Sequence, residues 1–353
     1  MDLTAPDLAM RTTALGPGGF LSLADFEPAA IADLLALARR LERAPEPAAL
    51  RGRVLALLFF NPSLRTLASF QSGMARLGGS SFVIQPGQGS WALESRDGAV
   101  MDGAAAEHVR EAIPVLAGYA DALGIRAFAA GSDLAADLDD LAFRRLAELS
   151  PVPVVNLESA IDHPCQALGD WKTLDDLGIP ARGGRLVLSW AWHPKPLPLA
   201  VPAAVLDMAA RRGMEVTVLR PEGFALPAPL MARARHAAAA SGGAVDETAD
   251  RGAALAGAHV LYAKSWTAPS RYGDAAGEAE LRAGLRGWCV DEPWFAPARP
   301  DCRFLHCLPV RRNVVVADAV LDGPRSAVLP QAKNRMWAQM AVLYRLLRGG
   351  GAT

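Results

Sequence analysis

Residues 54–60 read VLALLFF, and residues 61–66 directly after them read NPSLRT. Seven consecutive apolar residues predict a short strand that is buried on both faces, as in a parallel sheet. The asparagine, proline and serine that follow predict the start of a helix, which we expect over 66–77 before the pair Gly78-Gly79 ends it. A buried strand that leads straight into a helix is the unit from which α/β proteins are built.

The same alternation of apolar runs and amphipathic stretches continues along the chain. We expect further strands at 81–84, 123–128, 152–156, 185–190, 215–219, 259–264, 287–290 and 304–306. We expect further helices at 26–43, 104–120, 199–211, 229–241 and 331–348. The pattern predicts an α/β protein with two doubly wound parallel-sheet domains joined by helices, the C-terminal helix packing back on the first domain. The first domain is expected over residues 1–160 with 331–353 returning to it, and the second over 161–330.

Composition limits the class of protein. The chain has 353 residues, 36 basic and 37 acidic side chains and a formal net charge of −1. This balance argues against a nucleic-acid-binding or membrane-surface protein, because both need a basic excess. No apolar run approaches the ~20 residues of a membrane span, and residues 1–4 (MDLT) do not resemble a secretory signal. Because four cysteines are too few for a disulfide framework, we expect a soluble protein of the cytoplasm.

The first candidate site is the segment 61–66, at the carboxyl end of the opening strand. Free backbone N–H groups and the positive end of the helix dipole favour an anion there. Ser63 and Thr66 add hydroxyl groups, and Arg65 adds a planar guanidinium that matches phosphate oxygens. The alternative is an ordinary capped helix with an exposed arginine. A dinucleotide site is not expected, since Gly87-Gln88-Gly89 lacks the further glycine of that fingerprint.

Two further segments follow predicted strands. In residues 163–166 (HPCQ), His163 can donate a hydrogen bond to a developing oxyanion, and Gln166 offers both a donor and an acceptor. Residues 306–313 (HCLPVRRN) contain a candidate cis peptide before Pro309, and a turn there can present the carbonyls of Cys307 and Leu308 to an amide N–H. The structural alternatives are a capped helix with a packed cysteine and a basic surface loop.

Metal and nucleophile chemistry are not expected. His163, Cys165, His306 and Cys307 are ligand types for zinc, but their spacings are unusual and no Cys-x-x-Cys occurs. No base can be assigned to Cys165 as a thiol nucleophile, and no Gly-x-Ser-x-Gly elbow of a serine hydrolase occurs. We expect neither a metal nor a cofactor.

The remaining candidate site residues are single charged or aromatic residues near the ends of predicted strands. Arg126 lies in an apolar run, where an arginine is costly unless it is paired or liganded. Glu158 follows another predicted strand, and Lys195 and Lys264 follow two more in a chain with only four lysines. Trp91 lies on a Gly/Pro loop, where a tryptophan is more typical of a subunit interface or a site than of a free surface.

Together the three motifs carry a resemblance. Ser-x-Arg-Thr after a buried strand, His-Pro-Cys-Gln, and His-Cys-Leu-Pro with Arg-Arg-Asn resemble the aspartate/ornithine carbamoyltransferase family in order and spacing over nearly the whole chain. Segments 190–197 and 263–266 and the loop from Trp91 to Glu94 are similar to its N-acetylornithine branch. The Asp-x-x-x-Ser-Met-Gly loop of ornithine carbamoyltransferases is absent near Lys264. The resemblance implies carbamoyl phosphate and N-acetylornithine as substrates, no metal, and a homotrimer with shared active sites.

For carbamoyl phosphate, the resemblance implies a role for each matching residue. The phosphate would be bound by Ser63, the Leu64 backbone N–H, Arg65, Thr66, Arg126, Arg335 and, from a neighbouring subunit, Trp91. His163, Thr66 and Arg126 would polarise the carbamoyl oxygen. Gln166 would hold the carbamoyl amine together with the carbonyl of Leu308, beside Cys307. No covalent intermediate is implied, and the leaving phosphate would accept the proton of the attacking amine.

For the amine substrate, the resemblance implies contacts with Glu158, Lys264 and Leu308, with Lys264 facing the α-carboxylate. Glu94 matches the position that separates acetyl from succinyl caps, because a carboxylate there would repel the second carboxylate of a succinyl group. Two segments depart from the family pattern. No lysine follows Asn313, where the chain reads VVV, and residues 269–278 are unlike those of relatives, so no ligand contact is assigned to them.

Three alternatives stay open at this point. The same transfer could use free ornithine or N-succinylornithine. A silent relative could only bind carbamoyl phosphate or serve as a structural subunit, which the intact motif residues disfavour. An NAD-type dehydrogenase could share the two-domain architecture, which the missing glycine fingerprint disfavours.

Overall fold

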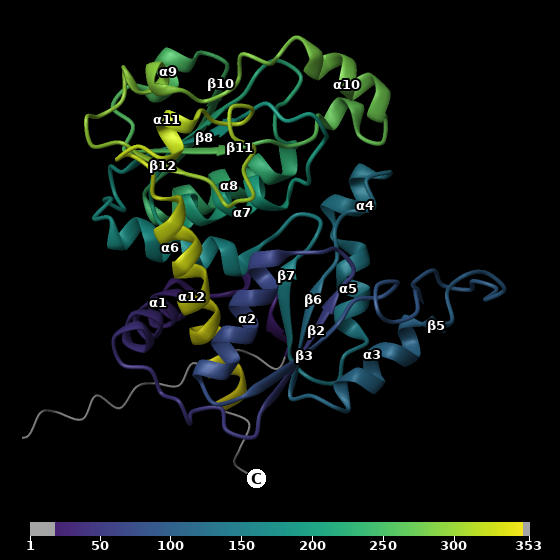
Figure 1. Cartoon of the computed structure of the whole chain (residues 1–353). Coiled ribbons are helices and arrows are strands. Elements are labelled where there is room, and N and C mark those ends of the chain that lie inside the picture. The colour runs from purple at the N-terminus through teal and green to yellow at the C-terminus, as the bar shows by residue number, and fades with distance from the viewer. Residues whose placement is uncertain (1–17, 349–353) are drawn as a thin grey trace, which may run out of the picture.

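The computed structural model describes residues 18–348 and contains two parallel sheets of five strands each, shown in Figure 1. The first has the order β1-β7-β6-β2-β3 and the second the order β10-β9-β8-β11-β12. The strands of the first sheet are β1 (Gly19–Phe20), β2 (Val54–Phe59), β3 (Ser80–Ile84), β6 (Ala122–Arg126) and β7 (Val154–Glu158). Those of the second are β8 (Arg185–Trp190), β9 (Glu215–Leu219), β10 (Ala244–Thr248), β11 (Val260–Lys264) and β12 (Arg303–Leu305).

Strand β2 shows why this sequence makes a sheet covered on both faces. Leu55, Leu57 and Phe59 belong to one core cluster, with residues of helices α1, α2 and α12, while Ala56 and Leu58 belong to another, with residues of α3 and α5. Successive side chains of a strand point to opposite faces, so an unbroken apolar run fills both cores. These helices are α1 (Pro28–Arg43), α2 (Leu64–Arg76), α3 (Val109–Ala117), α5 (Leu141–Glu148) and α12 (Val328–Arg348).

Two helices connect the halves of the molecule. Helix α6 (Pro164–Asp176) leaves the first sheet after β7, and α12 returns from the second sheet to contact α1, α2 and α6. In Figure 1, α12 is the long yellow helix that runs from the second half back along the first. The predicted α/β class, with a C-terminal helix that packs back on the first domain, is confirmed. The domain boundary near residue 160 stays a prediction; this position lies in the chain between the end of β7 at Glu158 and the start of α6 at Pro164.

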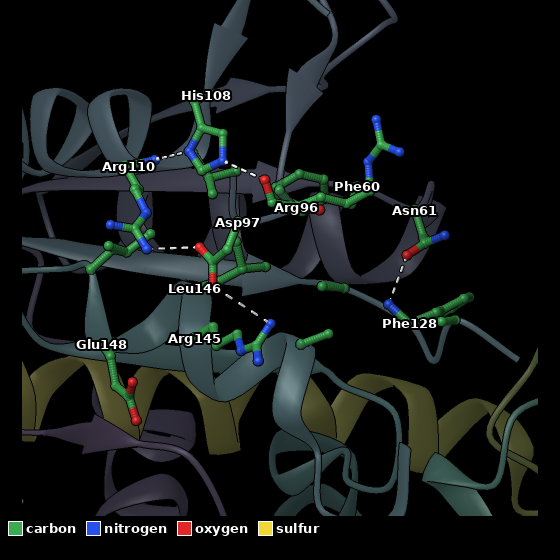
Figure 2. A pocket seen from close by; sticks show the side chains of 16 residues that line it. Phe60, Asn61, Arg96, Asp97, His108, Arg110, Phe128, Arg145, Leu146 and Glu148 are labelled. Carbon is green, nitrogen blue, oxygen red and sulfur yellow. Dashed lines mark hydrogen bonds and ion pairs between the residues drawn. The ribbon is translucent and has the colours of Figure 1, made fainter. Parts of the chain in front are cut away.

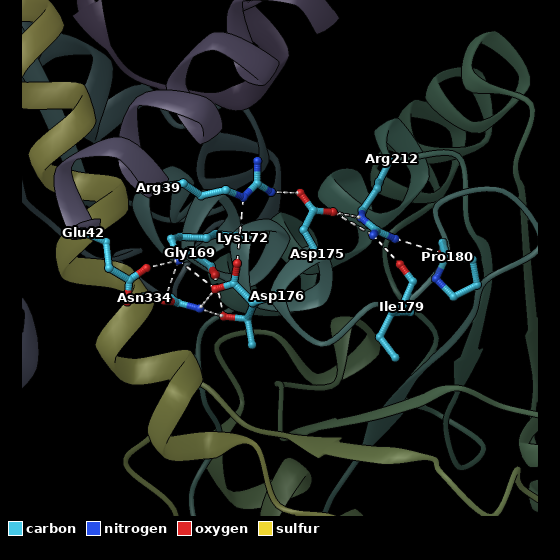
Figure 3. Close-up of polar contacts among 11 residues, drawn as sticks. Arg39, Glu42, Gly169, Lys172, Asp175, Asp176, Ile179, Pro180, Arg212 and Asn334 are labelled. Carbon is cyan, nitrogen blue, oxygen red and sulfur yellow. Dashed lines mark hydrogen bonds and ion pairs between the residues drawn. The ribbon is translucent and has the colours of Figure 1, made fainter. Parts of the chain in front are cut away.

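A polar cluster joins these helices (Figure 3), and we call Lys172, Glu42, Asp176 and Asn334 the junction cluster. The Lys172 Nζ atom donates to Glu42 Oε2 at 2.6 Å, Asp176 Oδ2 at 2.7 Å and Asn334 Oδ1 at 3.0 Å, although the lysine is 0% exposed. These partners come from α1, α6 and α12. A buried ammonium is tolerated only when its donors are matched, and here all three are.

Some predicted bounds are wrong. Residues 287–290 form no strand, because Val290 makes only an isolated bridge to Val316 outside the sheet. The helix predicted over 104–120 covers only Val109–Ala117, because Glu107–His108 instead form strand β5, which pairs with β4 (Leu93–Glu94). Strand β10 was not predicted, since it is an edge strand with exposed polar residues.

The remaining elements are short helices and two helices of the second half. They are η1 (Leu23–Asp25), α4 (Leu134–Leu138), α7 (Ala200–Arg211), α8 (Ala228–Ser241), α9 (Arg251–Leu255), η2 (Pro269–Arg271), α10 (Ala275–Ala283), η3 (Glu292–Phe295) and α11 (Asp318–Leu321). Within residues 18–348, no helix has both the length and the apolar character needed to cross a bilayer.

Candidate active site

The carboxyl ends of β2, β6 and β7 open onto a cavity of about 630 Å³ that residues of the second half close from the other side. Ligands of open α/β sheets bind at this edge of the strands. The three sequence motifs, far apart in the chain, meet in its lining. The predicted residues found there are Ser63, Leu64, Arg65, Thr66, Arg126, Glu158, His163, Gln166, Lys264, Cys307, Leu308 and Arg335.

The start of helix α2 forms one wall. Ser63 is the N-cap residue, and its Oγ accepts from the Thr66 N–H at 3.3 Å and donates to Thr66 Oγ1 at 3.0 Å. Arg335, which comes from α12, donates to the same Thr66 Oγ1 at 2.8 Å. Asn61 Oδ1 accepts from the Phe128 N–H at 2.8 Å, which connects this loop to the segment after β6. The start of α2 therefore has two arginines beside it: its own Arg65, and Arg335 from the C-terminal helix α12.

Three arginines of this wall retain unused donors. The Nε atoms of Arg65, Arg126 and Arg335 are buried and have no hydrogen-bond partner among residues 18–348. Burial lowers the pKa of Arg65 and of Arg335, and the nearby charge of Arg126 lowers both further. An arginine stays protonated in a protein. The wall thus holds buried positive charge without enough acceptors, which an anion such as a phosphate would satisfy.

A carboxylate and an imidazole lie beside these arginines. Arg126 forms an ion pair with Glu158, at the ends of neighbouring strands β6 and β7, and its guanidinium lies 4.5 Å from the ring centre of Phe128. His163 Nε2 lies 3.5 Å from Glu158 Oε2, which is long for a hydrogen bond. Burial, and then the charges of Arg335 and Arg126, lower the pKa of His163 well below its usual value. The imidazole is therefore neutral near pH 7.

The opposite wall of the cavity includes polar backbone atoms of the segment that follows β12. The Leu308-Pro309 peptide is cis, as the sequence suggested, and Leu308 has a positive φ of 56°. His306 Nδ1 accepts from the Leu308 N–H at 2.8 Å and holds this turn. The carbonyl oxygens of Cys307 and Leu308 accept no hydrogen bond from any residue between 18 and 348, so both are available to an N–H of a ligand.

The far part of the cavity carries a free ammonium. The side-chain ammonium of Lys264, the last residue of β11, forms no hydrogen bond or ion pair with the part of the chain that the structure describes, while its backbone carbonyl accepts from the Ala191 N–H. Close by in the lining, Arg311 Nε donates to His193 Nε2 at 3.1 Å. Lys195 lies in the adjoining loop, where its N–H donates to His193 Nδ1 at 3.1 Å, and is not a lining residue. Lys264 is therefore the lining cation best placed for a carboxylate.

Trp91 and Glu94 are not in the lining of this cavity. Trp91 is 60% exposed, and its Nε1 donates to Glu107 Oε2 at 2.7 Å. The Glu94 carboxylate accepts from the Arg96 guanidinium at 2.8 Å and from two backbone N–H groups, and these hydrogen bonds lower its pKa to about 2. In a single copy of the chain, neither side chain lies among the residues that line the cavity.

A second cavity of about 700 Å³ lies beside that loop, between β5 and helices α3 and α5 (Figure 2). Its polar residues already bond one another: Arg110 donates to Asp97 at 2.7 Å, and His108 accepts from the Arg110 N–H at 3.1 Å. It shares only Phe128 with the first cavity and contains none of the three motifs. The first cavity is therefore the candidate active site.

Cys165, the candidate thiol nucleophile, is a buried free cysteine. Burial raises the pKa of the Cys165 thiol to about 12, so this residue is not a thiolate. Residues 18–348 contain no group of three or more histidine, cysteine, aspartate or glutamate residues that could hold a metal ion. One functional neighbour was missed from the sequence: Asp170, which accepts from Gln166 Nε2 at 2.7 Å. Its position four residues after Gln166 on one helix is the one local signal from which this contact could have been predicted.

Comparison with known proteins identifies the family. Residues 19–176 match the carbamoyl-phosphate-binding domain of aspartate/ornithine carbamoyltransferases, and residues 201–346 match the Asp/Orn-binding domain. The chain belongs to this family. It is accordingly a carbamoyltransferase, and the family expected from the three motifs is confirmed.

Individual relatives differ in their amine substrate. The chain is 40% identical over 331 residues to N-acetylornithine carbamoyltransferase of Xanthomonas campestris pv. campestris, covering 93% of this chain and 97% of that protein. It is 36% identical over 297 residues to N-succinylornithine carbamoyltransferase of Bacteroides fragilis, covering 84% and 88% of the two chains. A crystal structure of acetylornithine transcarbamylase with acetylcitrulline matches with a TM-score of 0.89 at 40% identity, covering 93% of this chain and 98% of that one.

Proposed function

We propose that the protein transfers the carbamoyl group of carbamoyl phosphate to the δ-amine of N-acetyl-L-ornithine, giving N-acetyl-L-citrulline and phosphate. The observation that carries this proposal is the set of unpartnered polar atoms in one cavity: arginine donors on one wall, and the Gln166 Oε1 acceptor with two free carbonyls facing an amide. Such a reaction belongs to arginine biosynthesis, which we place in the cytoplasm.

The phosphate of carbamoyl phosphate would lie at the start of α2. The proposed contacts are the hydroxyl groups of Ser63 and Thr66, the backbone N–H of Leu64 and the guanidinium groups of Arg65, Arg126 and Arg335. The free N–H groups and the dipole of α2 favour an anion at this end of the helix. Phosphate bound here is both held and stabilised as a leaving group.

The carbamoyl oxygen would point to His163, Thr66 and Arg126. A neutral imidazole carries one N–H that can donate without bringing in a further charge, and Arg126 supplies the charge. When the amine attacks, this oxygen gains negative charge, and donors aimed at it stabilise the transition state by several kcal/mol. Gln166 Oε1 and the carbonyl of Leu308, beside that of Cys307, would accept from the carbamoyl NH₂ and fix the plane of the group.

The amine substrate would enter from the side of Lys264. The Lys264 ammonium would bind its α-carboxylate, while Glu158 and the Leu308 carbonyl orient the chain that ends in the δ-amine. The amine nitrogen forms a bond to the carbamoyl carbon, the bond from carbon to the phosphate oxygen breaks, and phosphate takes the proton that the amine loses. The reaction therefore needs no further base, and positioning is the main contribution of the protein.

An acetyl cap is favoured by the relatives, since N-acetylornithine enzymes are 40% identical and the N-succinylornithine enzyme of Bacteroides fragilis is 36% identical. The proposed repulsion of a succinyl group by Glu94 is weaker than the sequence suggested, because Arg96 neutralises that carboxylate. We expect Glu94→Gln to raise the use of N-succinylornithine, relative to N-acetylornithine, by only a few-fold. An unchanged ratio would remove Glu94 from the account of specificity.

The direct test offers three amines to the purified protein with carbamoyl phosphate, and measures the citrulline-type product. We expect turnover of N-acetylornithine at a kcat/KM at least tenfold above those of N-succinylornithine and ornithine. Turnover of ornithine alone would overturn the choice of substrate but not the chemistry. No transfer to any of the three would overturn the proposed function itself.

We also propose that the protein is a homotrimer in which Trp91 of one subunit completes the site of the next. Exposed apolar residues gather on the first half of the chain and support an interface there: Trp91, Val100, Met101, Val115, Tyr119 and Leu141. Arg65→Ala and Trp91→Ala would then impair opposite sides of a shared site. Mixing the two inactive variants after mild dissociation should restore part of the activity, because some sites then receive both intact residues. If sites lie within single chains, mixing restores nothing.

A further inference from the structure

Behind Gln166 lies a buried set of polar residues that we call the Asp170 cluster: Asp170, Gln331 and Tyr262. Asp170 and Gln331 are both 0% exposed, and so is Tyr262. Asp170 Oδ1 accepts from Gln166 Nε2 at 2.7 Å and from Gln331 Nε2 at 2.8 Å, while Oδ2 accepts from the Tyr262 hydroxyl at 3.0 Å. Four elements meet here, namely α6, α12, β11 and the segment after β12. None of these three residues lines the cavity.

The His306 backbone N–H determines which way the hydrogen bonds of Gln331 in this cluster run. The His306 backbone N–H, which can only donate, bonds Gln331 Oε1 at 3.0 Å. The Gln331 amide must therefore present its Nε2 to Asp170, and it also donates to the Tyr262 hydroxyl at 3.1 Å. That hydroxyl uses its own proton on Asp170, so three donors converge on one carboxylate. An ionised carboxylate accepts all of them, and a neutral amide or alcohol in its place could not.

The Asp170 carboxylate also determines which end of the Gln166 amide is available in the cavity. Because Nε2 of Gln166 is held by the carboxylate, Oε1 is the amide atom left for a ligand, and it has no partner in residues 18–348. A glutamine amide is nearly symmetric in shape and can turn over unless one end is anchored. Burial raises the pKa of Asp170 to about 6, and the carboxylate is thus still mainly ionised near neutral pH.

We propose that Asp170 is a positioning residue that fixes the orientation of the Gln166 amide and so makes the site select a carbamoyl NH₂ over a methyl group at the same place. The proposal rests on the proposed function, in which Gln166 accepts from that NH₂. A site built to accept a hydrogen bond rejects an analogue that lacks the donor, because its buried acceptor is then left unpaired. Loss of the anchor would let Gln166 present either end, and the selectivity would fall.

The test measures competitive inhibition against carbamoyl phosphate by two probes. Phosphonoacetamide carries the NH₂ group, and 2-oxopropylphosphonate carries a methyl group in its place. Inorganic phosphate serves as a third inhibitor, which reports only the arginine wall. For the wild type we expect phosphonoacetamide to bind at least about tenfold more tightly than 2-oxopropylphosphonate. The ratio of these two inhibition constants is the readout, since a general loss of packing would weaken both.

Asp170→Leu removes the carboxylate with little change of volume, and Asp170→Ala serves as a second variant with the same expected effect. In either, the ratio should fall to within about threefold of unity and kcat should drop at least tenfold, while inhibition by phosphate changes less than threefold. Asp170→Asn should retain most of the ratio, because its oxygen can still accept from Gln166. Tyr262→Phe and Gln331→Met are matched controls that remove another member of the cluster but leave the carboxylate on Gln166, and both should keep the wild-type ratio.

Each outcome bears on the proposal. An unchanged ratio of inhibition constants in Asp170→Leu or Asp170→Ala would overturn the proposal. Loss of the ratio in Tyr262→Phe or Gln331→Met would also overturn it, because the cluster would then have a purely structural role. This second result can be obtained even if both loss variants do not fold. If the wild type binds neither probe and transfers no carbamoyl group, the proposed function has failed instead, and the two failures are thereby distinguished.

Discussion

Two buried charge clusters each include a residue of α12, Asn334 in one and Arg335 in the other, and use their charges differently. In the junction cluster, Lys172 is 0% exposed and donates to three acceptors, which match its three protons (Figure 3). In the candidate active-site cavity, the Nε atoms of Arg65 and Arg335 are also shielded from water, yet they have no partner within residues 18–348. The first arrangement is complete by itself, and the second is completed only by a ligand.

This difference indicates what each cluster contributes. A buried charge that loses its partners destabilises a protein, so paired charges such as those of the junction cluster hold helices in register. Unpaired buried donors are a cost to the folded chain, and they persist where they are used for binding or catalysis. Substitutions in the junction cluster should therefore act on stability, and substitutions in the cavity should act on the reaction.

The largest expected effect is on catalysis. Arg65→Ala removes a guanidinium from the proposed phosphate site, and we expect kcat/KM for carbamoyl phosphate to fall roughly thousandfold, which is about 4 kcal/mol of transition-state stabilisation. Steady-state kinetics with N-acetylornithine at saturation provide the measurement. Arg299→Ala is a matched control, because Arg299 is an exposed arginine that does not line the cavity and whose guanidinium pairs with Asp301. Normal transfer by Arg65→Ala would refute the assignment of the cavity.

A second test concerns a buried carboxylate that belongs to neither cluster. Asp162 precedes His163, accepts from the Ser22 hydroxyl at 2.5 Å and the His163 N–H at 2.7 Å, and has no ion pair in residues 18–348. Burial raises its pKa from 3.8 to about 7. A raised pKa means that the folded state binds the proton more tightly, so the contribution to stability is full below about pH 4 and is lost as the pH rises through about 7.

The Asp162→Asn variant isolates this effect from other titrating groups. The difference in unfolding free energy, wild type minus variant, should decrease by roughly 1 kcal/mol per pH unit between about pH 4 and pH 7 and stay level above that range. Urea denaturation at four or five pH values would measure it. The buried neutral imidazoles of His163 and His306 change stability in the opposite direction but are common to both proteins. A difference that is flat with pH would contradict the assigned burial of Asp162.

A smaller effect on stability is expected in the junction cluster. Lys172→Met keeps most of the side-chain volume but leaves Glu42 and Asp176 without their shared cation, and we expect a loss of about 2 kcal/mol in unfolding free energy. The value is below that for a fully buried pair because the Glu42 and Asp176 side chains are 29% and 37% exposed. Denaturant titration gives the measurement. The folded variant should keep its kcat within about threefold, and a large loss of kcat with unchanged stability would reverse the roles of the two clusters.

The sequence predicted the sheets better than the connections. Strands β8 and β9 have the expected bounds because an apolar run between turn residues leaves little choice. Residues 287–290 were expected as a strand from local composition alone, but a strand also needs a neighbour, and Val290 finds only Val316. Strand β10 escaped prediction for the opposite reason, since its pairing with β9 makes a strand of a polar, exposed segment.

In the site, too, local features could be predicted from the sequence and contacts between distant segments could not. The motif residues were identified because chain position relative to strands and helix starts is a local property. The coupling of Thr66 with Arg335, 269 residues apart, depends on how α12 returns and was available only through the family resemblance. The contact between Asp170 and Gln166 was missed because an aspartate on a helix is most often a solvated residue, and nothing local showed that Tyr262 and Gln331 converge on it.

The most direct test of the contrast between the clusters is the change in melting temperature that phosphonoacetamide causes in Arg65→Ala. We predict that the ligand-free variant melts at or slightly above the wild-type temperature, since a cation with an unpaired buried Nε has been removed. Saturating phosphonoacetamide should raise the melting temperature of the wild type by several degrees and leave that of the variant unchanged. A ligand-free variant that melts well below the wild type, or one that phosphonoacetamide stabilises as much as the wild type, would contradict the account.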